Sequence, residues 1–165
     1  MKKDALNLKI IYFAILAGQM LFLGVLFFVI KPPYEPQTIL RILGPLIALG
    51  LIIIGFYVYR LPLKKLDHLR QIEEQNILDN EALPLPEEEI KKLFGTYRAS
   101  SLVRMCMVEF ANLMLLAFYY MSGDHLLIFY FTLGLVVFGT TAPSIRQFAR
   151  DYELTLVEER ALQRD

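Results

Sequence analysis

The chain has 165 residues, of which 56% are hydrophobic and 21% are charged, with 17 basic and 17 acidic side chains. A net charge of zero excludes the general electrostatic attraction that draws basic proteins to nucleic acid, so we expect no nucleic-acid partner. The single cysteine, Cys106, excludes an intramolecular disulfide and a multi-cysteine metal cluster. Apolar and charged residues are segregated along the chain, which is not typical of a soluble domain.

Four apolar stretches, at residues 10–30, 42–59, 105–121 and 126–142, contain one acidic or basic side chain between them, Glu109. An α-helix rises about 1.5 Å per residue, so roughly 20 apolar residues cross the ~30 Å hydrocarbon core of a bilayer. The sequence therefore predicts an all-α, polytopic membrane protein with four transmembrane helices in a single membrane domain, residues 1–165. The first stretch is longer than the core of a secretory signal and no small-residue cleavage site follows it, which predicts an uncleaved span.

The positions of the basic residues predict the orientation in the membrane. Fifteen of the 17 lie in the N-terminal tail, in the connection 60–104 or in the tail 143–165, whereas the other connections contain only Lys31 and Arg41. Cytoplasmic loops of membrane proteins carry an excess of Lys and Arg. Both termini, the connection 60–104 and the tail 143–165 are therefore expected in the cytoplasm.

The connection 60–104 contains two segments with a helical pattern. Leucine or isoleucine recurs every third residue from 63 to 72, which predicts either a short amphipathic helix on the inner leaflet or a continuation of the second span. A further helix is expected from Pro86, because three glutamates follow it and two lysines come later, as the helix dipole favours. Gly95 is expected to end that helix.

The tail 143–165 is expected to form two more short helices. After Pro143, apolar residues recur at the spacing of an amphipathic helix face, at Ile145, Phe148, Ala149 and Tyr152. Thr155 and Glu158 have the spacing of a capping box, which predicts a last short helix through Leu162.

The order of the four spans is typical of two helical hairpins with the same orientation. Each hairpin is expected to end in a proline, Pro62 or Pro143, followed by a basic amphipathic stretch. Both enter from the cytoplasm, so they would be parallel repeats related by an axis along the membrane normal. A polar residue lies in the first helix of each hairpin, Gln19 in one and Glu109 in the other. Two unrelated hairpins remain the alternative.

Glu109 is the principal candidate for a functional group, because a carboxyl inside a membrane normally faces protein or a water-filled cavity. Asn112 lies one turn further on the same expected interior face, together with Met105, Leu116 and Tyr120. Expected partners at similar depth are Gln19, Tyr57 and Thr140, whereas Arg104 is expected to extend toward the headgroups. Two interpretations follow: a proton or cation site at Glu109, or a polar interlock in which Glu109, Asn112 and Gln19 hydrogen-bond across helices.

The remaining polar residues predict neither a metal site nor a cofactor. His68 is expected in the cytoplasm and His125 at the outer turn, so the two cannot share a metal. None of the HExxH, GxSxG, P-loop or GxGxxG patterns occurs in the sequence. An intramembrane enzyme would need a second catalytic group near Glu109, and we expect no enzymatic activity.

The second half of the chain carries a resemblance to a group of known proteins. The residues concerned are 97–104 (Tyr97 to Arg104), the span with Glu109, the turn 122–124 (Ser-Gly-Asp) and the segment 143–146 (Pro-Ser-Ile-Arg). In these features the chain resembles small four-span inner-membrane proteins of bacteria, which implies a bacterial inner membrane and no particular activity. Small multidrug transporters and rotary-ATPase proteolipids fit less well, since the former carry their carboxylate in the first helix and the latter are rich in glycine.

These features predict a small integral membrane protein of structural or accessory type. It would act by helix packing, with the lipid bilayer around it and either a second copy of itself or a larger membrane complex as partner. The alternative is a secondary transporter or proton-conducting subunit that uses Glu109.

Overall fold

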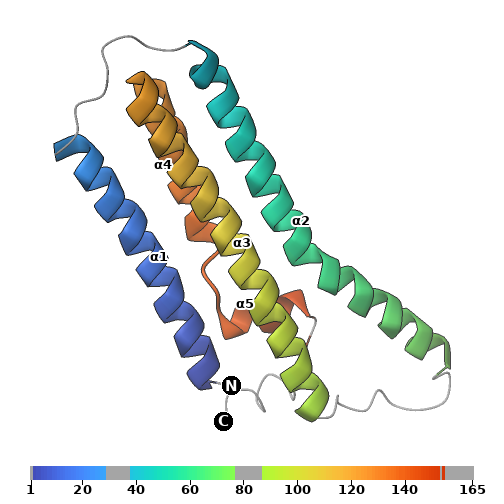
Figure 1. The fold of residues 1–165 in the computed structure, drawn as a ribbon. Helices are drawn as coiled ribbons and strands as arrows, with labels where there is room; N and C mark the ends of the chain where they lie inside the picture. Colours follow the sequence, from blue (N-terminus) through green and yellow to red (C-terminus); the bar gives the residue numbers. More distant parts are fainter. Residues whose placement is uncertain (1, 29–37, 77–86, 153, 155–165) are drawn as a thin grey trace.

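The computed structural model describes residues 2–28, 38–76, 87–152 and 154, and these parts of the chain are almost entirely α-helical (Figure 1). The helices are α1 (Lys2–Phe28), α2 (Thr38–Asn76), α3 (Glu87–Ser122), α4 (His125–Thr140) and the short α5 (Ile145–Asp151). The prediction of an all-α protein is confirmed for the described residues.

Three of these helices are long and apolar enough to cross a membrane, at Lys3–Phe28, Thr38–Leu63 and Glu88–Ser122. With 16 residues, α4 is only about 24 Å long, which is short of the hydrocarbon core. It passes the same test together with α5, but the two helices are bent by 79° relative to each other. The described residues therefore provide three candidate spans, or four if α4 and α5 together count as one.

The helices alternate in direction, and α3 is the central element of the bundle. It packs against α1, α2 and α4, and its contact with α2 is the most extensive. In Figure 1, α1 and α2 lie on opposite sides of α3 and α4. An ion pair between Arg98 Nη1 and Asp4 Oδ1, 3.2 Å apart, joins α3 to the start of α1.

A single buried seam runs along most of α3. Its members follow one another at alternating spacings of four and three residues, and none exposes more than 5% of its surface: Ile90, Phe94, Tyr97, Ser101, Arg104, Val108, Ala111 and Leu115. An average spacing of 3.5 residues keeps one side of a helix in contact with nearly parallel neighbours, as in coiled coils. The seam explains why α3 remains one straight element from Glu87 to Ser122.

Two predicted helix ends are not observed. Gly95 does not end the helix that begins at Glu87, because the buried seam continues through it and outweighs the roughly 1 kcal/mol that a helical glycine costs. Pro62 lies inside α2, which continues to Asn76. Residues 63–72 are therefore helical and continuous with the second span. A proline is tolerated within such a helix because neighbouring groups satisfy the freed backbone carbonyl.

The connections on either side of α4 follow their sequence signals. Gly123 adopts a positive φ of 65° between α3 and α4, and the Asp124 side chain caps α4 by accepting from the Leu126 backbone N–H at 2.9 Å. Ser144 caps α5 in the same way, accepting from the Gln147 N–H at 3.0 Å. The break at Pro143 between α4 and α5 is as expected.

The amphipathic pattern of residues 145–152 is confirmed, and its apolar side is buried against protein. Phe148, Ala149 and Tyr152 are buried, and the Phe148 ring lies 5.2 Å from the rings of both Phe94 and Tyr97 on α3. The helix expected over residues 155–162 lies outside the described residues.

Candidate functional site

A fully buried polar contact joins α1 to α3. The Asn112 Nδ2 group donates a hydrogen bond of 2.9 Å to Gln19 Oε1, and both side chains are fully buried. Each amide uses only part of its hydrogen-bonding capacity in this contact, because Gln19 Nε2 and Asn112 Oδ1 have no partner among the described residues. The contact therefore couples two helices through one hydrogen bond in an apolar environment.

Helix α4 completes this site through a glycine. A Cβ atom added at Gly134 would lie 1.9 Å from Asn112 Oδ1, far inside van der Waals contact. The Asn112 amide thus rests directly on the backbone of α4, at a place where any larger residue would displace it. We call Gln19, Asn112 and Gly134 the amide interlock, since one residue from each of three helices meets there.

The amide interlock lies near the middle of the apolar part of α3. Arg104 precedes Asn112 by eight residues and Asp124 follows it by twelve, which corresponds to roughly 12 and 18 Å along the helix axis. A hydrogen bond at this depth has no water to compete with it. Measured interhelical hydrogen bonds in membrane proteins nevertheless average only about 0.6 kcal/mol, with a maximum of about 1.7.

Glu109 is not brought together with the other two expected site residues. Its side chain is half-buried, and it forms no hydrogen bond or ion pair with any residue that the structure describes. Of its expected partners, Gln19 bonds Asn112, Tyr57 is 58% exposed, and the Thr140 hydroxyl donates to the Val137 carbonyl. Because three helical residues turn through 300°, Glu109 lies about 60° around α3 from Asn112, at the edge of the packed face.

A second buried polar cluster, which the sequence did not predict, lies where α5 meets α2 and α3. Arg104 is 3% exposed, contrary to the expectation that it extends to the headgroups. Its Nη2 donates to the Thr141 carbonyl at 3.3 Å, and its Cζ lies 3.8 Å from the centre of the Tyr59 ring. Such a cation–π contact stabilises a desolvated guanidinium without a direct ion pair.

Two tyrosine hydroxyls in this cluster fix α5 to the bundle. Tyr59 donates to Asp151 Oδ2 at 2.5 Å, while the Tyr97 hydroxyl donates to the Ser144 carbonyl and accepts from the Ser144 N–H, both at 3.2 Å. We call Tyr59, Tyr97 and Arg104, with their partners Thr141, Ser144 and Asp151, the α5 anchor. Tyr152 packs beside it, and its buried hydroxyl has no partner in the part of the chain that the structure describes. Burial raises the pKa of Tyr152 to about 12.

The burial of one member of the α5 anchor, Arg104, could have been predicted from the sequence. Arg104 falls in the alternating four-and-three spacing of the buried seam, between Ser101 and Val108, and a residue at that position is expected to be covered. The pairing of Tyr59 with Asp151 has no such signal, because the two residues are 92 positions apart.

Of the two histidines, His125 has a side chain that the structure describes. His125 is exposed at the start of α4, with its ring 5.8 Å from that of Tyr119, and the side chain of His68 lies outside the described residues. Within the described ranges, no group of three or more His, Cys, Asp or Glu side chains could hold a metal ion.

Comparison of the chain with known protein families, with curated proteins and with solved structures finds no match. The expected kinship with small four-span inner-membrane proteins of bacteria therefore rests on the residues given above.

Proposed function

We propose that the protein is a small structural or accessory component of a membrane, acting by helix packing with a second copy or within a larger complex. The observation that carries the proposal is the amide interlock, in which fully buried polar side chains are used to hold α1, α3 and α4 together. Polar residues that hydrogen-bond between helices are a common means of fixing membrane bundles. The α5 anchor supports the same conclusion, since its charged groups are engaged in contacts within the chain.

The orientation and the membrane belong to the same proposal. We place both termini in the cytoplasm, because 15 of the 17 basic residues flank the helix ends on that side. The proposal also includes the description as two parallel hairpins, α1–α2 and α3–α4. The packing of α3 against α4 supports the second hairpin, whereas α1 and α2 both pack on α3 and lie on opposite sides of it (Figure 1). The resemblance carried by residues 97–104, 122–124 and 143–146 supports the inner membrane of a bacterium.

One observation favours a second candidate function. Glu109 is a half-buried carboxyl in the apolar part of α3, without a hydrogen bond to any described residue, and unpaired carboxyls inside membranes commonly mark proton or ion pathways. The alternative is therefore a transporter or proton-conducting subunit that uses Glu109.

Two substitutions distinguish the candidates. Asn112→Leu removes the interlock and Glu109→Gln removes only the charge, and each variant is compared with the wild type for proton flux in dye-loaded liposomes and for assembly by native mass spectrometry. The structural proposal expects weaker assembly and a loss of about 0.6–1.7 kcal/mol of stability in Asn112→Leu, and no change in Glu109→Gln. A wild-type proton flux that Glu109→Gln abolishes, with assembly intact, would establish the alternative instead.

A further inference from the structure

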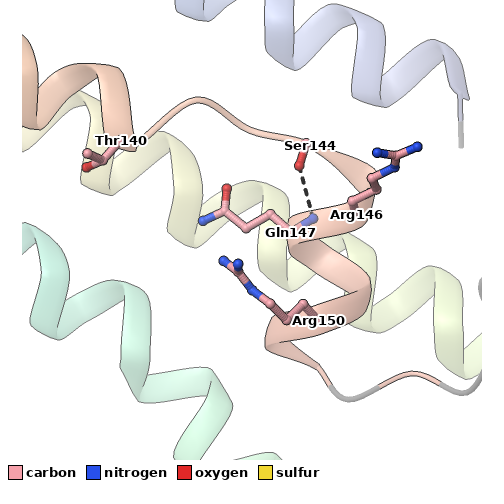
Figure 2. A pocket seen from close by; sticks show the side chains of 5 residues that line it. All are labelled: Thr140, Ser144, Arg146, Gln147 and Arg150. Carbon is pink, nitrogen blue, oxygen red and sulfur yellow. Dashed lines mark hydrogen bonds between the residues drawn. The ribbon is translucent and has the colours of Figure 1, made fainter.

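A shallow hollow of about 370 Å³ lies at the bend between α4 and α5, apart from the amide interlock (Figure 2). It is lined by Thr140, Ser144, Arg146, Gln147 and Arg150. Gln147 and Arg150 extend from α5 toward the same side, while Arg146 extends from another side of α5 (Figure 2). Among the described residues, the lining contains two cations and no acidic side chain.

The donors around the hollow are only partly used within the described part of the chain. Arg150 Nε donates to Asp151 Oδ1 at 3.4 Å in an ion pair, and the side chain of Arg150 nevertheless remains 78% exposed. Arg146 is exposed and forms no ion pair with any described residue. The hydroxyl of Thr140 donates its hydrogen bond to the Val137 carbonyl. Two guanidinium groups and the Gln147 amide therefore remain to bind a group that only accepts hydrogen bonds.

The hollow lies at the level where the apolar part of the bundle ends. The hydrogen bond between Tyr59 and Asp151 places the end of α5 beside the last residue of the apolar stretch 42–59. Thr140, on the other wall, is close to the end of the apolar stretch 126–142. Because α5 is bent by 79° from α4, it lies across the end of the bundle rather than along it. This is the level of the lipid headgroups for a bundle that spans a bilayer.

We propose that this hollow binds the phosphate of an anionic phospholipid headgroup through Arg150 and Gln147, with Arg146 adding positive charge at its edge. Guanidinium groups match phosphate oxygens in both charge and geometry. The α5 anchor fixes the position of these side chains, because Tyr59 and Tyr97 hydrogen-bond to Asp151 and Ser144 and so hold α5 against the bundle. A lipid is favoured over free phosphate because the hollow adjoins the apolar ends of α2 and α4, where acyl chains surround the protein.

The test measures retention of phosphatidylglycerol by the purified full-length protein, using native mass spectrometry, with phosphatidylcholine and inorganic phosphate as competing probes. Each basic side chain near a membrane surface contributes about a factor of five to anionic-lipid binding. We expect about fivefold weaker binding in Arg150→Gln and about 30-fold in Arg146→Gln/Arg150→Gln. The matched control, Lys3→Gln/Lys9→Gln, removes two exposed charges from the same end of the bundle but outside the hollow, and it should weaken binding clearly less than Arg146→Gln/Arg150→Gln does.

Four results would overturn the proposal. If the control lost as much lipid binding as Arg146→Gln/Arg150→Gln, the loss would be due to overall charge and not to the hollow. If phosphatidylcholine were retained as well as phosphatidylglycerol, the anionic headgroup would not be what the hollow recognises. Displacement of the lipid by millimolar inorganic phosphate would assign the hollow to free phosphate. Lipid binding that emerges only after deletion of residues 155–165 would identify this segment, which contains three acidic and two basic side chains, as the occupant.

Discussion

The sharpest prediction concerns Gly134, the glycine on which the Asn112 amide rests. In Gly134→Ala, the new methyl group would lie 1.9 Å from Asn112 Oδ1 and 3.0 Å from its Cγ. The amide cannot move toward α4, so it must swing away and lose its hydrogen bond to Gln19. A single added methyl group should therefore loosen three helices at once.

The size of this effect follows from three contributions. Overpacking of a tight contact costs about 1–3 kcal/mol, and the lost interhelical hydrogen bond costs about 0.6–1.7 kcal/mol. Replacing glycine by alanine in a helix returns about 0.8–1 kcal/mol. We expect Gly134→Ala to lower the free energy of unfolding by about 1–4 kcal/mol.

The assay is unfolding by titration with sodium dodecyl sulphate, followed by circular dichroism. Gly139→Ala is the matched control in the same helix, because a Cβ atom at Gly139 would meet nothing within 4 Å. It should be neutral or gain up to about 1 kcal/mol. In the background of Asn112→Ala, the clash no longer exists, so Gly134→Ala should then behave like the control, giving a coupling energy of at least about 1 kcal/mol.

Two outcomes would refute this reasoning. Equal stabilities of Gly134→Ala and Gly139→Ala would mean that the amide does not rest on α4. A loss in Gly134→Ala that persists unchanged in the Asn112→Ala background would place the clash on another residue.

The same titration tests two further pairs. Gly55→Ala brings a Cβ atom to 2.9 Å from Met107 Cβ and should lower the free energy of unfolding by about 1–3 kcal/mol. Its control, Gly50→Ala, meets nothing within 4 Å and should not lower the stability. Equal stabilities of the two variants would argue against close approach of α2 and α3. Tyr97→Phe removes the partner of a backbone N–H and C=O and should cost about 1–3 kcal/mol, whereas Tyr152→Phe removes a buried hydroxyl that has no partner among the described residues and should be neutral or stabilising. Equal losses in the two tyrosine variants would contradict the assigned hydrogen bonds.

The sequence was sufficient for features that depend on local composition. The described residues of the apolar stretches are almost all helical, although α2 and α3 extend well beyond their stretches and α4 is shorter than the hydrocarbon core. The buried side of α5 could also be predicted, because Phe148, Ala149 and Tyr152 recur at the spacing of one helix face. Gln19 and Asn112 stand out for the same reason, as amides in otherwise apolar segments.

Features that depend on distant contacts could not be predicted. Gly95 and Pro62 carry local signals for a helix end, and packing along α2 and α3 outweighs both. The burial of Arg104 requires the Tyr59 ring and the Thr141 carbonyl, which come from other helices. Periodicity alone places Glu109 near the packed face, but a rotation of about 60° separates its position from that of Asn112.

The central position of α3 also bears on the order in which the chain can assemble. α1 contacts α3 through Asp4 and Gln19, and α2 makes its most extensive contact with α3. During synthesis α1 and α2 are made before α3, so each is first present in the bilayer without α3, the helix against which it packs. Until Asn112 arrives, Gln19 lacks its hydrogen-bond partner in the lipid. A nascent chain stopped after α2 should therefore hold two separate helices, and the bundle should form only when the third helix is inserted.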